Sequence, residues 1–265
     1  MLLLLYPSIK ATSSTVRLVP LSRHAARSIR AQIVTLLYNL VDRIYIGWMA
    51  DGMLAMAAVG ICAPIVTVVT AFTGLLGRGG APLAAIRVGE GKKPEAEAYL
   101  GNSFSMLVLS SLAITLLVLL FREPLLILFG ASENTLAYAE DYITTYILGT
   151  LFVQLTVGMN YYITTQGFAN TAMVTTMLGG VLNIVLDPLF IFTLGMGVRG
   201  AALATVISQF ASFVWVMAFL FGKRTQLKIR PGNLRPRFSV LRQIVVLGSA
   251  PLFHEPLGGP PPHLL

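Results

Sequence analysis

The amino-acid sequence predicts an all-α polytopic membrane protein with six transmembrane helices and the start of a seventh. Hydrophobic residues make up 55% of the 265 residues and charged residues only 11%, and the mean hydropathy is +0.77. Soluble domains carry roughly 25% charged residues, so the composition disfavours a water-soluble fold, a disordered chain and a nucleic-acid-binding domain. Uncharged stretches long enough to cross a bilayer, which takes about 20 residues, recur along the chain.

The positions of the charges divide the chain into spans. The uncharged stretch from Tyr142 to Leu186 is too long for one helix, and the polar residues 164–171 divide it into a fourth and a fifth span. The fifth continues past Asp187 to about Met196. The spans are expected at 31–50, 51–78, 97–121, 142–163, 172–196 and 200–222, and residues 239–253 resemble the start of a seventh.

Basic residues fix the expected orientation. Sixteen of them fall in the first thirty residues, in the loop after the second span and in the loop after the sixth, whereas the opposite side carries Arg122 and Arg199. The positive-inside rule then places both ends of the six-span unit in the cytoplasm. The same loops could bind nucleic acid or anionic lipid, but orientation alone explains the alternation, and we expect no nucleic-acid partner.

Four segments follow from this pattern. Residues 1–30 form an atypical basic segment whose Ser- and Arg-rich composition is shared with organellar transit peptides, and residues 31–222 form a six-helix lobe. Residues 223–238 form a basic cytoplasmic loop. Residues 239–265 are interpreted as a truncated seventh helix followed by a Pro/Gly tail, which cannot continue a helix.

Enzyme signatures are missing from the sequence. There is no Walker-type phosphate loop, and the glycines at 74, 77, 79 and 80 lack the spacing of a dinucleotide fingerprint, so we interpret them as sites of close helix packing. The three histidines lie near the termini, and the single cysteine, Cys62, allows neither an intramolecular disulfide nor a cysteine metal cluster. We therefore expect no enzyme activity and no cofactor.

Two acidic residues inside the spans are the main functional signal. An aspartate at the centre of a transmembrane helix costs roughly 2.5–3.5 kcal/mol even on the lower scales, and such residues usually face an ion or substrate path. Asp42 lies in the first span beside Arg43, and it could simply be the neighbour of that cation near an interface. Asp187 precedes Pro188, which breaks a helix, although it could be a merely structural hydrogen-bond acceptor.

Neutral polar residues extend this candidate site. Asn183 lies one turn before Asp187 on the same helical face. Asn160 in the fourth span and Thr205 in the sixth could add polar groups at a similar depth. Tyr142 begins the fourth span, where its ordinary role would be an interfacial anchor.

Five runs of sequence, in order and with consistent spacing, resemble the multidrug and toxic compound extrusion (MATE) family in its DinF/MepA-like bacterial branch. They are LYNLVDRIYIG at 37–47, GGAPLA at 79–84, QGFA at 166–169, LNIVLDPLFI at 182–191 and GAALAT at 200–205. The resemblance covers about residues 32–250. It implies a multi-pass protein of the bacterial inner (plasma) membrane.

The resemblance also implies an activity and a site. Members of the family are secondary antiporters of two six-helix lobes, in which drugs or organic cations leave the cell while Na⁺ or H⁺ enters. By motif, the coupling and substrate residues are Asp42, Asp187, Asn183, Asn160, Tyr142 and Thr205. Asp42 and Asp187 would be the ligands of a sodium ion.

The chain departs from the family pattern at both ends. The family's second lobe is missing after the seventh helix begins, and we expect the chain to be a fragment that is inactive alone. Two other functions stay open. A flippase for lipid-linked precursors, of related fold, would be expected to line its cavity with arginines, whereas only Arg43, Arg78 and Arg199 approach the spans. A membrane-embedded enzyme is disfavoured by the missing signatures.

The orientation can be tested with a topology reporter. A reporter fused directly after Lys223–Arg224 should read as cytoplasmic, because seven basic residues cluster in this loop. A matched fusion in the loop that carries Arg199 should read as extracytoplasmic. A reversed result at either position would overturn the span count.

Overall fold

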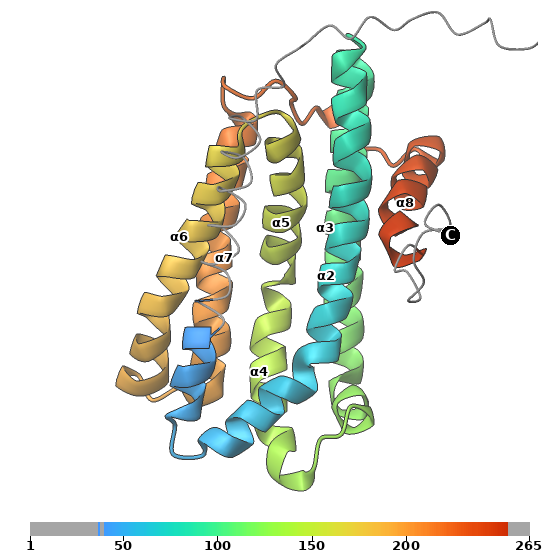
Figure 1. Cartoon of the computed structure of the whole chain (residues 1–265). Helices are drawn as coiled ribbons and strands as arrows, with labels where there is room; N and C mark the ends of the chain where they lie inside the picture. The colour runs from blue at the N-terminus through green and yellow to red at the C-terminus, as the bar shows by residue number, and fades with distance from the viewer. Residues whose placement is uncertain (1–36, 38–39, 254–265) are drawn as a thin grey trace, which may run out of the picture.

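The computed structural model describes residue 37 and residues 40–253, and throughout this part of the chain the regular elements are helices (Figure 1). Most of them run side by side, up and down one bundle. The elements are α2 Gly52–Gly89, α3 Lys93–Leu128, α4 Glu133–Leu148, α5 Thr150–Thr165, α6 Ala169–Pro188, the π-helical η1 Leu189–Thr193, α7 Gly197–Phe221, the 3-10 helix η2 Pro231–Asn233 and α8 Phe238–Phe253.

The predicted all-α membrane fold is confirmed. Four helical segments are long and apolar enough to cross a membrane: α2, α3, α6 continued by η1, and α7. Helices α4 and α5 make a fifth if the bent pair is counted as one span. These five correspond to the second to sixth predicted spans. Of the first, residues 40–47 are helical, and its remainder lies mostly outside the described residues, as do residues 1–30 and the tail at 254–265.

Two features of the spans differ from the prediction. The fourth span begins at Glu133 rather than at Tyr142, so Glu140 and Asp141 are inside the helix. Glu140 is paired with Arg122 of α3, which donates to its carboxylate with Nε and Oε1 3.3 Å apart, and Asp141 is exposed. The span also bends by 52° at the α4–α5 junction, where a side chain at Gly149 would run into Val206 of α7.

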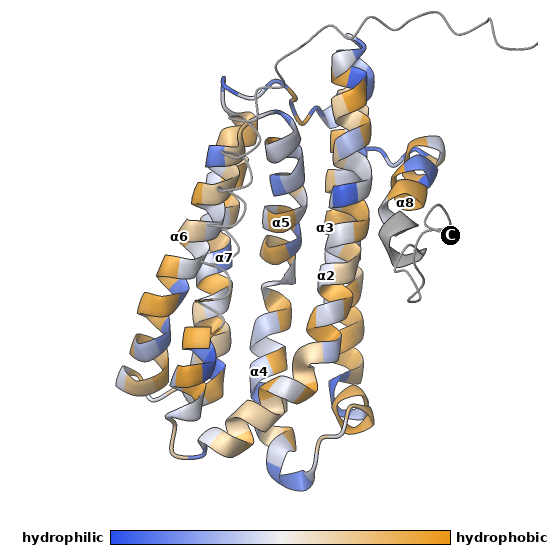
Figure 2. Ribbon diagram, in the orientation of Figure 1, coloured by the Kyte–Doolittle hydropathy of each residue, from blue (hydrophilic) through white to orange (hydrophobic). Residues whose placement is uncertain are grey.

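The outer surface of the bundle is apolar. Figure 2 shows hydrophobic residues over most of the helix surfaces, with hydrophilic residues gathered toward the ends. Large side chains such as Leu120, Val185 and Phe221 are more than half exposed. In a water-soluble protein this area would be an aggregation hazard, whereas in a bilayer it is the surface that faces lipid.

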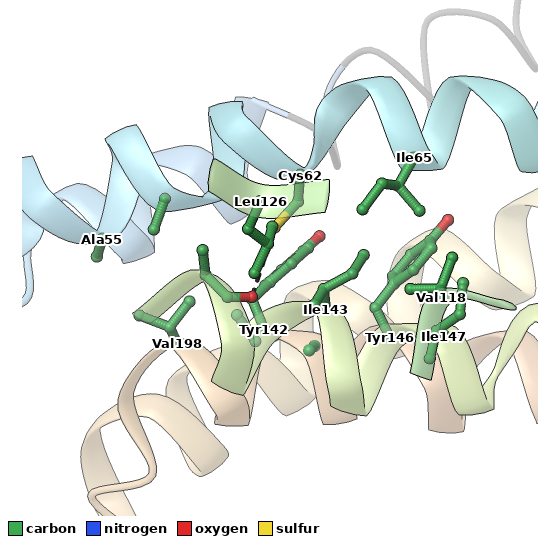
Figure 3. Packing of buried hydrophobic residues seen from close by; sticks show 14 of the residues in the cluster. Ala55, Cys62, Ile65, Val118, Leu126, Tyr142, Ile143, Tyr146, Ile147 and Val198 are labelled. Carbon is green, nitrogen blue, oxygen red and sulfur yellow. Dashed lines mark hydrogen bonds between the residues drawn. The ribbon is translucent and has the colours of Figure 1, made fainter. Parts of the chain in front are cut away.

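The interior is packed in two clusters. One joins Ile46 of the first helical segment to α2, α3, α4, η1 and α7, and Figure 3 shows its central part, with Cys62 of α2 beside Tyr142 of α4. The other lies nearer the basic loops and is built around Leu107, Met159 and Tyr162. The first cluster surrounds the candidate site.

The segment after α7 is fixed to the bundle by buried polar side chains. The Gln166 Oε1 atom accepts hydrogen bonds from Thr225 Oγ1 and from the backbone N–H groups of Gln226 and Leu227, at 2.9–3.0 Å. Glu97, only 2% exposed, accepts from the Lys228 backbone and pairs with the Arg230 guanidinium. We call residues 225–237 the linker.

A third anchor holds the far end of the linker. Asn102 of α3 is fully buried; its Oδ1 accepts from the Arg237 backbone N–H at 2.6 Å, and its Nδ2 donates to the Asn233 carbonyl at 3.3 Å. The neighbouring Gly101 lets the linker approach, because a Cβ there would come within 2.6 Å of the Asn233 carbonyl oxygen. The predicted basic loop is thus a fixed connection.

Helix α8 packs directly against α2. A Cβ on Gly79 would collide with the Ile244 carbonyl oxygen, and a Cβ on Gly248 would collide with the Leu75 carbonyl oxygen. Glycine at both positions lets the two backbones touch, which is how small residues drive helix association in membranes. The close packing expected at Gly79 is therefore observed.

The anchoring of the linker predicts that removing one anchor makes the linker more accessible to trypsin. Asn102→Ala removes two hydrogen bonds to the linker, each worth about 1 kcal/mol net, so tryptic cleavage after Lys228 and Arg237 should become about fivefold faster or more through local opening. Asn170→Ala is the matched control, since Asn170 is exposed. Equal cleavage rates in the two variants would show that Asn102 does not hold the linker.

Candidate functional site

Asp187 is the most buried charged side chain near the centre of the candidate site. It lies in the last turn of α6 and is 0% exposed. The following residue, Pro188, has no N–H to donate to the preceding turn, and directly after it the helix widens into the π-helical turns of η1. Such turns are frequent at functional sites. The expected break is therefore replaced by a local change of helix type, and the span continues to Thr193.

A short hydrogen-bonded chain links Asp187 to α7. Asn183 Nδ2 donates to Asp187 Oδ1 at 3.1 Å and lies 3.3 Å from Thr205 Oγ1, which accepts from it. Asn183 is itself 3% exposed. The structure thus brings together three of the residues selected from the sequence: Asp187, Asn183 and Thr205.

Asp42 completes this cluster from the first helical segment. Its carboxyl group lies close enough to that of Asp187 for the two to interact. Two carboxylates repel each other, so such a contact requires that one proton or one cation be held between them. Arg43 is exposed. Asp42 is therefore more than the neighbour of an interfacial cation.

Several oxygen atoms of the cluster have no partner among the described residues. They are Asp42 Oδ1, Asp187 Oδ2 and Asn183 Oδ1. A buried polar atom without a hydrogen bond costs roughly 1–3 kcal/mol. These three oxygens are of the kind that hard cations prefer. The described residues bring no three His, Cys, Asp or Glu side chains together as a metal site.

Tyr142 forms one wall of the cluster and is buried rather than placed at an interface. It is 8% exposed, stacks on Tyr146 with ring centroids 5.9 Å apart, and interacts electrostatically with both carboxylates (Figure 3). The interfacial position expected for it is wrong, because α4 starts two turns earlier than the charge pattern indicates.

Asn160 is not part of the cluster. Its Nδ2 atom donates to the Ala172 carbonyl in the first turn of α6, at 3.2 Å. Ala172 and Asp187 are at opposite ends of this helix, about 22 Å apart at 1.5 Å per residue. The similar depth expected for Asn160 is therefore wrong, and Asn160 links α5 to α6 near the basic loops.

Sequence reasoning missed other buried polar groups along the bundle axis. Gln154 of α5 is 0% exposed and accepts a hydrogen bond from Ser110 of α3 at 2.7 Å, while its Nε2 atom has no partner among the described residues. Ser208, one turn after Thr205, is also buried without a hydrogen-bond partner there. Gln154 could have been selected from the sequence, because it is a polar residue inside an otherwise apolar span.

Apolar spans around a buried aspartate, with a second carboxyl group beside it, define a class of protein: a polytopic α-helical membrane protein with acidic groups inside its bundle. A family model described as MatE matches residues 28–189. The chain therefore belongs to the MatE family, the family that its motifs resemble, and this is a family of transporters and not of enzymes.

Individual relatives agree with this assignment. The multidrug export protein MepA of Staphylococcus haemolyticus is 28% identical over 219 residues, which are 82% of this chain and 48% of that protein. A protein named FAD transporter from Shewanella oneidensis is 30% identical over 182 residues, 66% of this chain and 40% of the relative. The bacterial relatives and the apolar helices support a multi-pass protein of the inner (plasma) membrane.

A solved structure gives the same fold. The outward-facing conformation of a multidrug resistance MATE family transporter of the MOP superfamily matches with a TM-score of 0.78 and 31% identity, over 86% of this chain and 50% of that one. The chain thus spans about half the length of the relatives it matches.

Proposed function

We propose that the chain is one lobe of a secondary transporter that exports drugs or organic cations in exchange for Na⁺ or H⁺. The observation that carries the proposal is the proximity of Asp42 and Asp187, two carboxyl groups inside the apolar bundle that each keep an oxygen without a partner among the described residues. A site that needs a proton or a cation for its stability is a natural place to couple transport to an ion gradient.

The roles follow from the contacts. Asp42 and Asp187 hold the coupling ion, either as a proton between them or as Na⁺ bound to their free oxygens and to Asn183 Oδ1. Asn183 fixes the orientation of the Asp187 carboxyl and connects it to Thr205 on α7. Tyr142 excludes water and lipid from one side. Asn160, nearer the basic loops, is proposed to contact the substrate.

Coupling then arises from charge. The ion neutralises the carboxyl pair and stabilises the conformation in which the segment 40–47 is packed against α6. A cationic substrate favours the conformation without the ion, because it supplies the positive charge itself. Each ligand shifts the equilibrium between the two conformations only by its difference in affinity for them. Because the ion and the substrate favour opposite conformations, inward movement of the ion drives outward movement of the substrate.

Transport requires a second helical bundle to complete the central cavity. Transport by alternating access needs two bundles that move against each other around a central site, and the chain spans about half the length of its relatives. We propose that the chain acts as part of a longer assembly. Neither the flippase nor the membrane-embedded enzyme is favoured by any contact in the described residues.

Coupling can be tested in a protein completed with the second half of a relative. Asp187→Asn keeps the shape of the side chain but removes its charge, so efflux driven by a proton or sodium gradient should fall at least about tenfold, since coupling depends on that charge. Asp51→Asn is the matched control: Asp51 is exposed and accepts a hydrogen bond from Tyr138. Efflux in Asp187→Asn with unchanged pH and sodium dependence would contradict the proposed role.

The lobe itself can be tested as it stands. The 265-residue chain, purified and placed in lipid vesicles, should show no saturable dye export under an imposed ion gradient, because only one wall of the cavity is present. Saturable export that disappears in Asp187→Asn would show that single lobes suffice, as a pair, and would refute the proposed need for a second lobe.

A further inference from the structure

A cavity of about 670 Å³ lies between the ends of α2 and α3, the linker and the start of α8. It is far from the carboxyl pair, at the end of the bundle where the basic loops gather (top of Figure 1). Its walls carry four basic side chains, Arg87, Lys93, Arg230 and Arg237, and two acidic ones. The proposed transport site uses none of them.

The acids of the cavity are already neutralised. Glu97 pairs with Arg230, and Glu95 pairs with Arg87 through an Oε2–Nε distance of 3.2 Å. Arg87 also binds Glu90 outside the cavity, at 2.8 Å. Lys93 and Arg237 form no ion pair with any residue that the structure describes. The cavity therefore presents two uncompensated positive charges.

The position of the cavity in the helices adds to this charge. Helix α3 begins at Lys93 and has 36 residues, so its N-terminus contributes a partial positive charge directly at the cavity wall. Arg237 is held in place through its backbone N–H by Asn102, as described above. The backbone at Arg237 is therefore fixed, and the exposed side chains of Lys93 and Arg237 are accessible to a ligand.

The cavity lies at the depth of lipid headgroups. Helix α2 has 38 residues along a bent path, whereas about 20 residues suffice to cross the hydrocarbon core (Figure 1). Its last residues, which include Arg87, hence extend beyond the hydrocarbon. Beside the cavity, Phe238 and Val246 of α8 are 83% and 64% exposed, and they offer an apolar surface to acyl chains.

We propose that this cavity binds the phosphate of an anionic phospholipid headgroup, with Lys93 and Arg237 as its direct ligands. Arg87 and Arg230 shape the walls through their carboxylate partners. Basic pockets between transmembrane helices on the cytoplasmic side are suited to anionic headgroups, and the basic loops predict that this face is cytoplasmic. A free phosphate ester offers the same oxygens, so the test separates the two sources.

The test measures lipid retention by native mass spectrometry on the full 265-residue chain in neutral detergent, with phosphatidylglycerol or phosphatidylcholine as the probe. The variant K93Q/R237Q should bind phosphatidylglycerol about 30-fold more weakly than the unmodified chain, from about 1 kcal/mol per cation. The matched control K223Q/R224Q removes the same charges outside the cavity and should stay within about twofold. Phosphatidylcholine binding should be weak throughout.

A charge-conserving variant and competition with inorganic phosphate complete the test. Arg237→Lys keeps the charge and should retain most of the binding, which separates charge from misfolding, and circular dichroism checks the helix content of each variant. Millimolar inorganic phosphate should leave phosphatidylglycerol bound. Equal losses in the two double variants, or displacement by inorganic phosphate at that concentration, would overturn the proposal of a lipid site.

Discussion

The constraint on which the structure depends is that a carboxylate cannot stay unpaired in hydrocarbon. Asp187 is fully buried in a bundle whose outer surface is made for lipid. No bulk water reaches such a position, so its partners must come from the protein or from a bound ion. Asn183 donates one hydrogen bond to Asp187, and the Asp42 carboxyl group lies beside it. The contact with Asp42 ties the first helical segment to α6.

The same constraint is met differently at the other end of the bundle. Along the linker, Gln166, Glu97 and Asn102 satisfy the backbone groups of the chain that crosses them. At the carboxyl pair, three oxygen atoms have no partner among the described residues. The hydrogen bonds along the linker hold it against the bundle, whereas the carboxyl pair keeps free acceptor oxygens, which is the property on which its proposed ion binding rests.

The sequence predicted those parts of the fold that depend on the distribution of charge, which are the number and positions of the spans. Charge-free stretches located the spans because a charge in hydrocarbon is costly, whereas Glu140, paired with Arg122, shows why a charge need not end a helix. The partners of Asp187 on its own helix followed from helical spacing. The bend at Gly149 did not, because it depends on Val206 of another helix.

The predicted depth of Asn160 was wrong for a related reason. Hydropathy places a residue inside a span but does not set the register between neighbouring helices, and Asn160 contacts the first turn of α6 rather than its last. The linker anchors could not be predicted from the sequence either, because Glu97 and Asn102 lie more than a hundred residues before their partners. Contacts of that kind are set by tertiary packing.

The glycine contacts between α2 and α8 bear on where a longer transporter would divide into moving parts. Counted by helices, α8 starts a second repeat. Mechanically it belongs to the first, since its backbone touches that of α2 at Gly79 and Gly248 and the linker before it is fixed to α3. In a two-lobe protein built on this chain, these contacts would make α8 and the linker move together with the first lobe.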